Sequence, residues 1–413
     1  MVTEICRKAK ETANKFAGVT SEVKNAILTR TKALLLEREE EIISANKKDV
    51  IRAKENGRNE AFIDRLTLNH NRILGMAEGL DAIIALPDPV GEIVDEYTLQ
   101  NGLLVKRVRA PLGVIGIIFE ARPNVSLDAS ALCIKSGNGV ILRGSRESVN
   151  SVEVIVNCIK SALEEHGVSA DLVGVISDSD RQATIDMLKQ DKFIDVVIPR
   201  GGEALKKVVL DNATMPVVAS SGGNCHAYIA PDADMEIAKS VVLNAKTNRP
   251  STCNALETLL VDSEIAETAL PMLCKMLADN GVEVRVSEVA KNYYDGVCVI
   301  DEEELYKEYD NMIIKAHVVT GLTEAIAHIN KYSTHHSECI ITTDEEKMER
   351  FGKEVDSSAV YFNVSTRFTD GFELGLGAEM GISTQKLHVR GPIGLKELTS
   401  VKYVVKGNGQ LRK

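Results

Sequence analysis

The chain has 413 residues, of which 44% are hydrophobic and 26% charged, and its formal net charge is -11. This length and balance predict two or three globular domains with ample apolar material for a core. The acidic charge argues against a general nucleic-acid-binding protein, which would carry a basic face. An anionic substrate is still compatible, because a local cluster of Arg can bind phosphate on an acidic protein.

The cysteines and the apolar runs indicate the compartment. None of the eight Cys lies in a C-x-x-C pair, so zinc-ribbon and thioredoxin-like motifs are not predicted. The pair His335-His336 lacks Cys or carboxylate partners at a suitable spacing, and we expect no metal site. The first residues contain no apolar signal core, and no run reaches the length of a membrane span. We therefore expect a soluble, cytoplasmic protein with free thiols.

Helices are predicted throughout residues 1–86. After Ser21 apolar residues recur with a helical period, and Gly57 is expected to stop a helix. From residue 103 short strands alternate with helices, which is typical of a parallel α/β sheet. The strands are predicted near 103–108, 114–119, 139–144, 173–177 and 193–199, and the helices at 127–136, 147–166, 179–190 and 203–211.

A second α/β block follows. Its helices are predicted at 233–247, 264–279, 322–331 and 345–354, and its strands near 256–261, 283–286, 296–300, 313–319, 338–342 and 358–363. Residues 364–395 are Gly-rich and irregular, which is typical of a functional loop, and 401–405 form one more strand. Two α/β units in one chain indicate a cleft where a cofactor meets a substrate.

Cys253 is the first candidate for chemistry. In NRPSTCNALETLL (248–260), Pro250 breaks the preceding helix and Arg249 lies close by. A loop thiol near positive charge and backbone N–H donors has a lowered pKa and is a competent nucleophile. The alternative is a buried structural cysteine, the commonest role of this residue type.

Asn124 is the second candidate. In IIFEARPN (117–124) it follows a strand, where its amide can donate a hydrogen bond to a developing oxyanion. An Asx turn after Pro123 is the alternative interpretation.

Phosphate-binding groups are indicated in GNGVILRGSRES (137–148). Arg143, Ser145 and Arg146 follow a strand there and suit a phosphate. The alternative interpretation is a Gly turn with solvated charges. No G-x-G-x-x-G opens a helix, so the usual dinucleotide fingerprint is absent.

The segment VVASSGGNCH (217–226) is interpreted as a strand that runs into Ser-Ser-Gly-Gly, with Cys225 ending a strand beyond the Gly pair. A catalytic pair of Cys225 and His226 is not expected, because adjacent residues of an extended segment point to opposite faces.

Five strings, in this order, resemble the aldehyde dehydrogenase superfamily, and most closely its branch that reduces gamma-glutamyl phosphate: FEARPN, GNGVILRGS, RPSTCNALETLLV, NVSTRFTDG and GISTQKLHVRGPIGL. The resemblance implies an aldehyde dehydrogenase-like α/β fold with two α/β domains of parallel sheets and a small β oligomerisation element. Residues 1–225 would bind NADPH, with the 95–112 hairpin as an oligomerisation arm. Residues 226–385 would form the catalytic domain, and 386–413 would return and supply a C-terminal oligomerisation strand.

The resemblance also implies roles for single residues. Cys253 would attack the acyl phosphate carbon, and Asn124 with the Cys253 backbone N–H would form the oxyanion hole. The residues implied to bind NADPH are Arg143, Ser145, Arg146, Gly222 and Glu308. Four cations lie where the family's substrate-anchoring groups would come from: Arg122, Arg367, Lys386 and Arg390. The alternative is that they are solvated loop charges.

The implied reaction is the reduction of L-glutamate 5-phosphate to L-glutamate 5-semialdehyde, a step of proline biosynthesis, through a cysteine thioester and a thiohemiacetal. The substrate would be the small molecule glutamyl 5-phosphate, and neither nucleic acid nor membrane would be a partner. A homo-oligomer is expected, with an association with glutamate 5-kinase as a further expectation.

Two departures from the hydrolytic members of the superfamily support this branch. Those enzymes carry a Glu ahead of a Gly pair, which activates water against the thioester; this chain has Ser220 ahead of Gly222-Gly223, so water attack should be slow. NAD-dependent members often carry an acidic residue three positions after the cofactor-binding Lys. This chain has Arg146 three positions after Arg143, which would attract the 2′-phosphate of NADP.

Three alternatives stay open at this point. One is a CoA-acylating aldehyde dehydrogenase, and another is a non-phosphorylating one, which would need the missing Glu. The third is a nucleotide-binding regulatory protein without catalysis, which the presence of both Cys253 and Asn124 argues against.

Overall fold

The computed structural model describes residues 1–177, 180–220 and 222–412. Its contacts divide the chain into two compact units, each with its own sheet. Unit 1 comprises Met1–Ala219, Leu376–Gly381 and Ile393–Lys413. Unit 2 comprises Ser220–Gly375 and Ile382–Pro392. The irregular segment near the C-terminus therefore contributes to both units.

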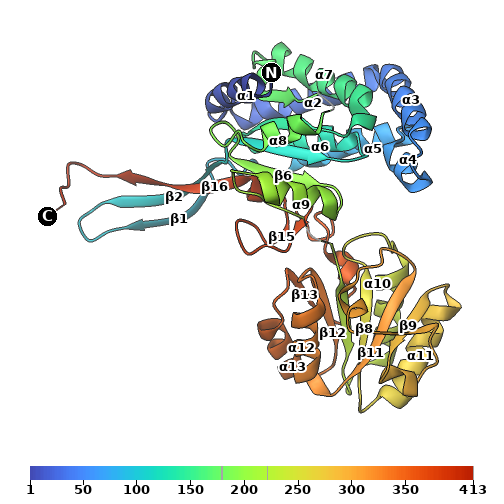
Figure 1. Cartoon of the computed structure of the whole chain (residues 1–413). Helices are drawn as coiled ribbons and strands as arrows, with labels where there is room; N and C mark the ends of the chain where they lie inside the picture. Colours follow the sequence, from blue (N-terminus) through green and yellow to red (C-terminus); the bar gives the residue numbers. More distant parts are fainter. Residues whose placement is uncertain (178–179, 221, 413) are drawn as a thin grey trace. The chain divides into compact units, whose positions relative to one another are not determined.

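Five helices open unit 1, as the periodicity predicts (Figure 1). They are α1 (Val2–Phe16), α2 (Ser21–Glu37), α3 (Glu39–Glu55), α4 (Glu60–Leu66) and α5 (His70–Ala85). Gly57 stops α3 as predicted: it has a φ of 69°, its N–H donates to the Lys54 carbonyl, and the Arg58 N–H donates to the Ala53 carbonyl. This paired closure is the Schellman arrangement, which glycine adopts without steric cost.

A four-stranded parallel sheet, in the order β5-β4-β3-β6, forms the centre of unit 1. Every residue of β3 and β4 is buried, as expected of inner strands covered by helices on both faces. The strands are β3 (Val114–Phe119), β4 (Gly139–Arg143), β5 (Val173–Val175) and β6 (Val196–Arg200), and the helices between or after them are α6 (Asn124–Lys135), α7 (Val149–Glu165), α8 (Arg181–Met187) and α9 (Glu203–Asn212). Position 179, the predicted start of α8, lies outside the described residues.

A narrow antiparallel ribbon extends from unit 1 (Figure 1). It consists of β1 (Ile93–Thr98), β2 (Leu104–Pro111) and β16 (Thr399–Lys406), in the order β1-β2-β16. All eight residues of β2 pair with β16, so the C-terminal segment is bound to the hairpin along its full length. We call this three-stranded sheet the arm. The hairpin and the C-terminal strand were both expected from the sequence.

Unit 2 is built on a seven-stranded parallel sheet in the order β10-β9-β11-β8-β7-β12-β13. Its strands are β7 (Cys225–Ile229), β8 (Leu256–Asp262), β9 (Glu283–Ser287), β10 (Cys298–Ile300), β11 (Ile313–Val319), β12 (Ser337–Ile341) and β13 (Ala359–Phe362). Its helices are α10 (Met235–Thr247), α11 (Ala266–Asp279), α12 (Gly321–Tyr332) and α13 (Glu345–Glu354). The predicted alternation of strand and helix is therefore confirmed in this block.

The interpretation of 217–226 is wrong. Among the described residues of that stretch, Val217 forms only an isolated bridge with Val197, and β7 begins at Cys225 instead of ending there. The reason is the Gly pair: Gly223 donates its N–H to a side chain, that of Glu308, and not to a neighbouring strand. Ser221, which belongs to the same stretch, lies outside the described residues.

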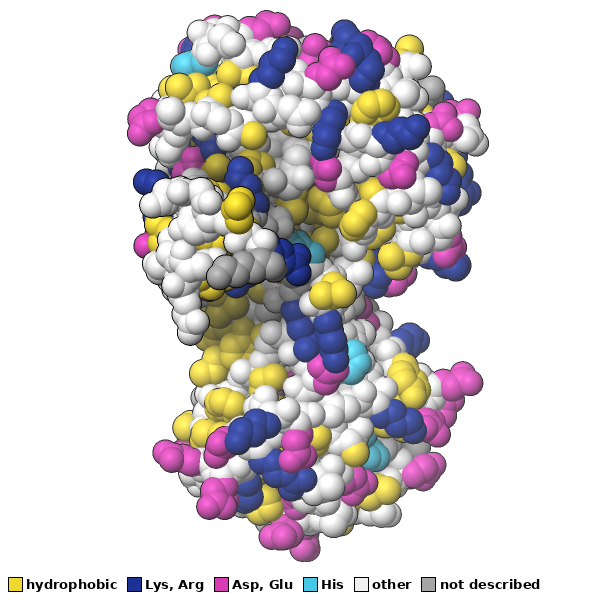
Figure 2. Space-filling model, turned by 90° about the vertical axis from the view of Figure 1, so that its left-hand side faces the viewer, with side chains coloured by type: hydrophobic (Ala, Val, Ile, Leu, Met, Phe, Trp, Pro, Cys, Tyr) yellow, Lys and Arg dark blue, Asp and Glu magenta, His cyan; other side chains and the backbone are white. Residues whose placement is uncertain are grey.

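The Gly-rich stretch 364–395 is mostly irregular, as predicted. It holds only the short pair β14 (Ile382–Ser383) and β15 (Gly391–Pro392) and a 3-10 turn at Thr366–Phe368. In the described part of the chain, no helix has the length and apolar character needed to cross a membrane. Figure 2 shows acidic and basic side chains intermingled on the visible face of unit 2, the lower part of the view. Short-range pairs such as Lys275–Asp279 and Arg350–Glu354 contribute to such mixed surfaces.

Candidate active site

Cys253 lies in the turn between α10 and β8. The helix ends at Thr247, ahead of Pro250, as predicted. Of the eight cysteines, six are buried and Cys298 is exposed, whereas Cys253 is half-buried. Side-chain hydrogen bonds fix the turn: Thr252 donates to the Arg249 carbonyl at 2.8 Å, and Thr366 donates to the Asn254 carbonyl at 2.7 Å. Cys253 therefore lies on a turn that side-chain hydrogen bonds stabilise, and it is neither a core cysteine nor a fully exposed one.

Two guanidinium groups lie near this turn. Arg367 donates from Nη1 to the Thr252 hydroxyl at 2.9 Å and also to the Asn254 side chain, so it bonds to both neighbours of Cys253. Burial lowers the pKa of Arg367, as does the positive charge of Arg249, while the Cys253 thiolate would raise it. Arg367, predicted to anchor the substrate, therefore stabilises the turn that contains Cys253.

The Gly222-Gly223 pair packs directly on this turn. A Cβ on Gly223 would overlap the carbonyl oxygen of Cys253, so no larger residue fits there. The next strand begins with Cys225, whose thiol donates to the same carbonyl at 3.2 Å. Burial raises the pKa of Cys225 well above its usual range, which keeps this thiol protonated and able to donate. The neighbouring His226 contacts Glu338 instead, on the other side of β7, as expected for adjacent residues of a strand.

Glu308 completes this part of the site. Its carboxylate accepts the Gly223 N–H at 2.5 Å and occupies the position that a Cβ on Gly222 would need. Gly222 and Glu308, both predicted to bind the cofactor, are therefore adjacent in unit 2. The structure brings these two residues, Cys253 and Arg367 together.

Lys386 and Arg390 form a separate cluster. Both bind Asp356, at 2.8 and 2.7 Å, and these two hydrogen bonds lower the pKa of Asp356 to about 2. Asp356 was not predicted from the sequence, since no local spacing connects it with the two cations. Their charge toward a substrate is partly neutralised by this carboxylate.

In unit 1, Asn124 is the first residue of α6 and follows the exposed Arg122 and the buried Pro123. Its amide Nδ2 donates to the Asp128 carboxylate at 2.9 Å. An Asx turn would use the side-chain oxygen of Asn124 as an acceptor, whereas the observed hydrogen bond uses its amide as a donor to a carboxylate one helical turn ahead. Burial raises the pKa of Asp128 to about 6, and the Asn124 hydrogen bond opposes that rise. Asp128 was missed by the sequence analysis, although the i, i+4 spacing signals it once α6 is known to begin at Asn124.

The predicted cofactor-binding residues of unit 1 lie at the end of β4. Arg143 is its last residue, is buried, and donates to the backbone carbonyls of Gly144 and Asp180. The hydroxyl of Ser145 lies 3.3 Å from that of Ser148. Arg146 begins a 3-10 turn and is exposed, and within the described ranges its guanidinium has no hydrogen bond or ion pair.

A cavity of about 180 Å³ lies beside these residues, between α7 and the end of β5. Its apolar walls come mainly from Val149, Val152, Val156, Val175 and Ile176. The sequence analysis missed this cavity. The spacing of the three α7 valines at i, i+3 and i+7 was a usable signal, because it places them on one helix face.

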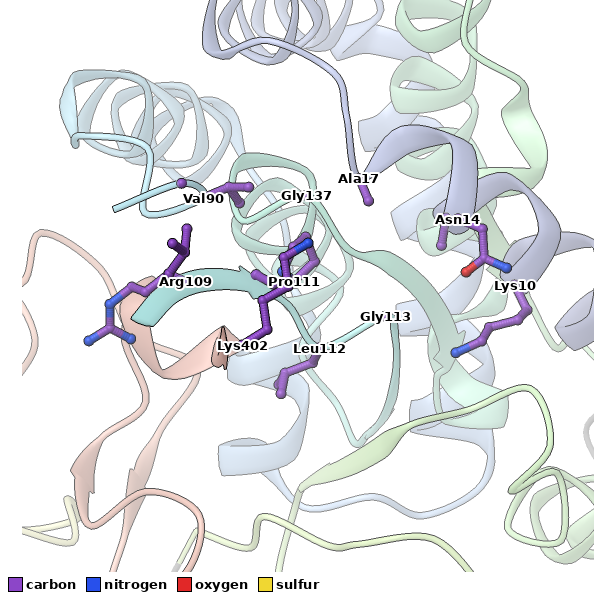
Figure 3. A pocket seen from close by; sticks show the side chains of 14 residues that line it. Lys10, Asn14, Ala17, Val90, Arg109, Pro111, Leu112, Gly113, Gly137 and Lys402 are labelled. Atoms are coloured by element: carbon purple, nitrogen blue, oxygen red, sulfur yellow. The ribbon is translucent and has the colours of Figure 1, made fainter. Parts of the chain in front are cut away.

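A larger cavity, about 350 Å³, lies between α1 and the base of the arm (Figure 3). Figure 3 shows the charged ends of Lys10 and Arg109 on opposite sides of it. Both cations are ion-paired, Lys10 with Asp195 at 2.6 Å and Arg109 with Glu92 at 3.2 Å. This cavity contains none of the predicted site residues.

Comparison with known proteins identifies the class. Residues 1–290 match the model of the aldehyde dehydrogenase family. The chain belongs to this family and is an oxidoreductase. The expected fold class, with two α/β units and a small antiparallel sheet, is confirmed.

Particular relatives narrow the class. The chain is 50% identical over 411 residues to the "Gamma-glutamyl phosphate reductase" of Carboxydothermus hydrogenoformans, covering 100% of this chain and 99% of that one. The crystal structure of gamma-glutamyl phosphate reductase from Thermotoga maritima matches with a TM-score of 0.98 and 43% identity, covering 100% of both chains. An acetylating aldehyde dehydrogenase from Geobacillus thermoglucosidasius shares the fold at 17% identity, with a TM-score of 0.69 and coverage of 100% of this chain and 97% of that one.

Proposed function

We propose that this chain reduces L-glutamate 5-phosphate to L-glutamate 5-semialdehyde and phosphate with NADPH, as a cytoplasmic enzyme of proline biosynthesis. The observation that carries the proposal is the half-buried Cys253 on a turn fixed by Arg367, in a chain that matches named gamma-glutamyl phosphate reductases over its full length. In this proposal unit 1 binds NADPH and unit 2 provides the nucleophile.

The chemistry begins at the Cys253 sulfur. The thiolate attacks the acyl carbon of the substrate, the bond from that carbon to the phosphate oxygen breaks, and phosphate leaves with a thioester on Cys253. The positive charge of Arg367, which interacts electrostatically with Cys253, favours the thiolate over the thiol. Asn124, oriented by its hydrogen bond to Asp128, would donate to the oxyanion together with the Cys253 backbone N–H.

The residues present fit a bound NADPH. The valine-lined cavity suits the adenine ring, and the exposed Arg146 at its side suits the 2′-phosphate. Ser145 lies next to Arg146 in the chain, and the buried Arg143 donates a hydrogen bond to the Gly144 carbonyl just before them. Glu308, beside Gly222, would hold the nicotinamide ribose. When bound, this cofactor supplies the hydride that converts the thioester, through a thiohemiacetal, to the aldehyde and frees the thiolate.

Arg367, Arg122, Lys386 and Arg390 are the cations proposed to anchor the substrate. Arg367 has the strongest support, because it borders the Cys253 turn. Lys386 and Arg390 would act together with Asp356. The two cations suit the substrate's carboxylate, and the Asp356 carboxylate suits its amino group.

The reverse reaction tests the proposal. Glutamate semialdehyde and NADP⁺ are supplied with phosphate, with CoA, or with neither, and NADPH formation is followed by absorbance. Rapid oxidation that requires phosphate supports the proposal. Oxidation that requires CoA would identify an acylating dehydrogenase, oxidation with neither would identify a hydrolytic one, and no oxidation at all would favour a nucleotide-binding protein without catalysis.

We also propose that the arm mediates self-association. Both of its outer strands carry exposed apolar side chains, among them Ile93, Tyr97, Tyr403 and Val405. Unpaired strand edges with apolar residues favour pairing with another chain. The double variant Tyr403→Lys, Val405→Lys should elute as a smaller species in size-exclusion chromatography with light scattering, and an unchanged mass would contradict this role. Association with glutamate 5-kinase remains a proposal that co-purification of the two proteins would test.

A further inference from the structure

The segment that carries Glu308 has no regular structure, yet buried side chains hold it at three points. It runs from the 3-10 turn Glu304–Tyr306 to the start of β11. Asn224 donates to the Leu305 carbonyl at 2.9 Å, Lys315 donates to the Lys307 carbonyl, and Glu257 accepts the Tyr309 N–H at 2.9 Å. These three bonds lie on both sides of Glu308 in the chain.

The three holding side chains belong to one electrostatic network, in which the charges of Glu257 and Lys246 act on Lys315. Lys315 also donates to the side-chain oxygen of Asn224 at 2.8 Å, and Glu257 forms an ion pair with Lys246 at 2.9 Å. All four are buried, with at most 1% of their surface exposed. They come from the beginnings of β7, β8 and β11, which are neighbours in the sheet, and from α10. The network therefore lies at the end of the sheet where these parallel strands begin, in contact with the segment that bears Glu308.

Lys315 is the central member. It is the one side chain of the network whose donor reaches both the Glu308 segment and the Asn224 that precedes β7. Burying an ammonium group is costly unless its hydrogen bonds and charge partners are in place. Burial lowers the pKa of Lys315 to about 8, while the charges of Glu257, Glu304 and Glu308 act in the opposite direction. The hydrogen bonds to the Lys307 carbonyl and the Asn224 side chain therefore offset the cost of burying this ammonium group.

We propose that Lys315 is a positioning residue for Glu308. By bonding Lys307 and Asn224 together, it keeps the Glu308 carboxylate on the Gly223 N–H and so keeps the Gly pair against the Cys253 carbonyl. The inference rests on the proposed function in one respect, the assignment of Glu308 to the nicotinamide ribose.

Kinetics of a double-mutant cycle test the coupling. Lys315→Met should lower kcat/KM for NADPH roughly tenfold, with KM for the acyl phosphate nearly unchanged. Glu308→Ala, which removes the acceptor of the Gly223 N–H, should do the same. The double variant should be no less active than the less active single variant, because both changes disrupt one interaction. Additive losses would overturn the inference. Lys24→Met is the matched control: Lys24 is also fully buried and ion-paired, with Asp88 at 2.8 Å in unit 1, and its effect should be confined to stability.

Hydrogen exchange of the protein without cofactor gives a second readout. Lys315→Met should speed amide exchange in peptides covering 222–229 and 304–312, and Lys24→Met should not. If Lys315→Met does not fold, Lys315→Gln, which is polar but too short to reach both oxygens, serves in its place. Unchanged exchange in both peptides would overturn the inference. Faster exchange together with a fully active Glu308→Ala would uphold the role of Lys315 and refute the assignment of Glu308 to the cofactor.

Discussion

The thiol of Cys225 donates a hydrogen bond to the backbone carbonyl of Cys253, with 3.2 Å between Sγ and O. The two cysteines therefore have different roles at one site. Cys225 is fully buried and stabilises the Cys253 turn through this hydrogen bond, whereas Cys253 itself is only half-buried.

This relationship predicts a graded response to mutation. Cys225→Ala leaves the Cys253 carbonyl without this donor and should lower the free energy of unfolding by about 1–3 kcal/mol, with most of the activity kept. Cys225→Ser keeps a donor and should be closer to the wild type. Thermal unfolding and steady-state rates measure both effects. Loss of activity in Cys225→Ala as large as that in Cys253→Ala would contradict the supporting role.

Arg146 should determine the preference for NADPH. Arg146 is exposed and lies in the chain between Gly144 and Val149, which both line the valine-lined cavity. Arg146→Glu should lower kcat/KM for NADPH and raise that for NADH, because a carboxylate repels the phosphate and can bind the ribose hydroxyls. Lys54→Glu makes the same change of charge on an exposed position of α3 and should leave the ratio unaltered. An unchanged ratio in Arg146→Glu would refute this role.

We expect that Ser220 takes the place of the hydrolytic base, since it lies where hydrolytic members of the superfamily carry a Glu. Ser220→Glu should introduce phosphate-independent oxidation of the semialdehyde, since a carboxylate ahead of the Gly pair can activate water against the thioester. The assay compares oxidation rates with and without phosphate. Ser220→Gln, which has a similar shape and no basic group, is the control. Rapid phosphate-independent oxidation by the wild type would show that this account of Ser220 is wrong.

The free energy of unfolding should fall as the pH drops below about 6.5, which is the usual pKa of an unperturbed histidine. Burial lowers the pKa of His226 to about 3, of His328 to about 2 and of His336 to about 4. The unfolded chain then binds more protons than the folded one, so each histidine destabilises the fold as the pH falls below 6.5, by up to about 1.4 kcal/mol per pH unit. Glu338 and Asp128, whose pKa values are raised, act in the opposite direction.

His328 offers the cleanest test of this pH dependence. It stacks on His317 and contacts Tyr332, so His328→Phe should keep the packing and remove one titrating group. Unfolding midpoints measured between pH 7.5 and pH 5 should fall less steeply in this variant. His70→Gln alters an exposed histidine paired with Glu39 and should follow the wild type. Parallel curves for all three proteins would contradict the prediction.

Local signals were sufficient for most elements. Periodicity and Gly57 located the N-terminal helices, and β-branched runs located the strands of both sheets, because these features act within a few residues. The Cys253 turn was likewise readable from Pro250. The segment before β7 was misread, since its apolar residues resemble a strand while the Gly pair that follows bonds to a distant side chain.

The remaining contacts of the site could not be predicted from spacing. Gly223 and Glu308 are 85 positions apart, and no local pattern pairs them. The same holds for Asp356, which binds both Lys386 and Arg390, and for Lys315, which reads in the sequence as an ordinary charge within a strand. Such contacts depend on the order of strands in the sheet, which the chain order does not reveal. The family resemblance supplied Glu308 but none of the residues that hold it.

The central claim is that the Cys253 thiolate is the nucleophile. The most direct measurement is the site of labelling when the protein reacts with less than one equivalent of iodoacetamide, read by peptide mass spectrometry alongside residual activity. Modification should occur on the Cys253 peptide and rise in step with the loss of activity, and Cys253→Ala should be about 10³-fold or more less active while still binding NADPH. Preferential labelling of another cysteine, together with an active Cys253→Ala variant, would contradict the account.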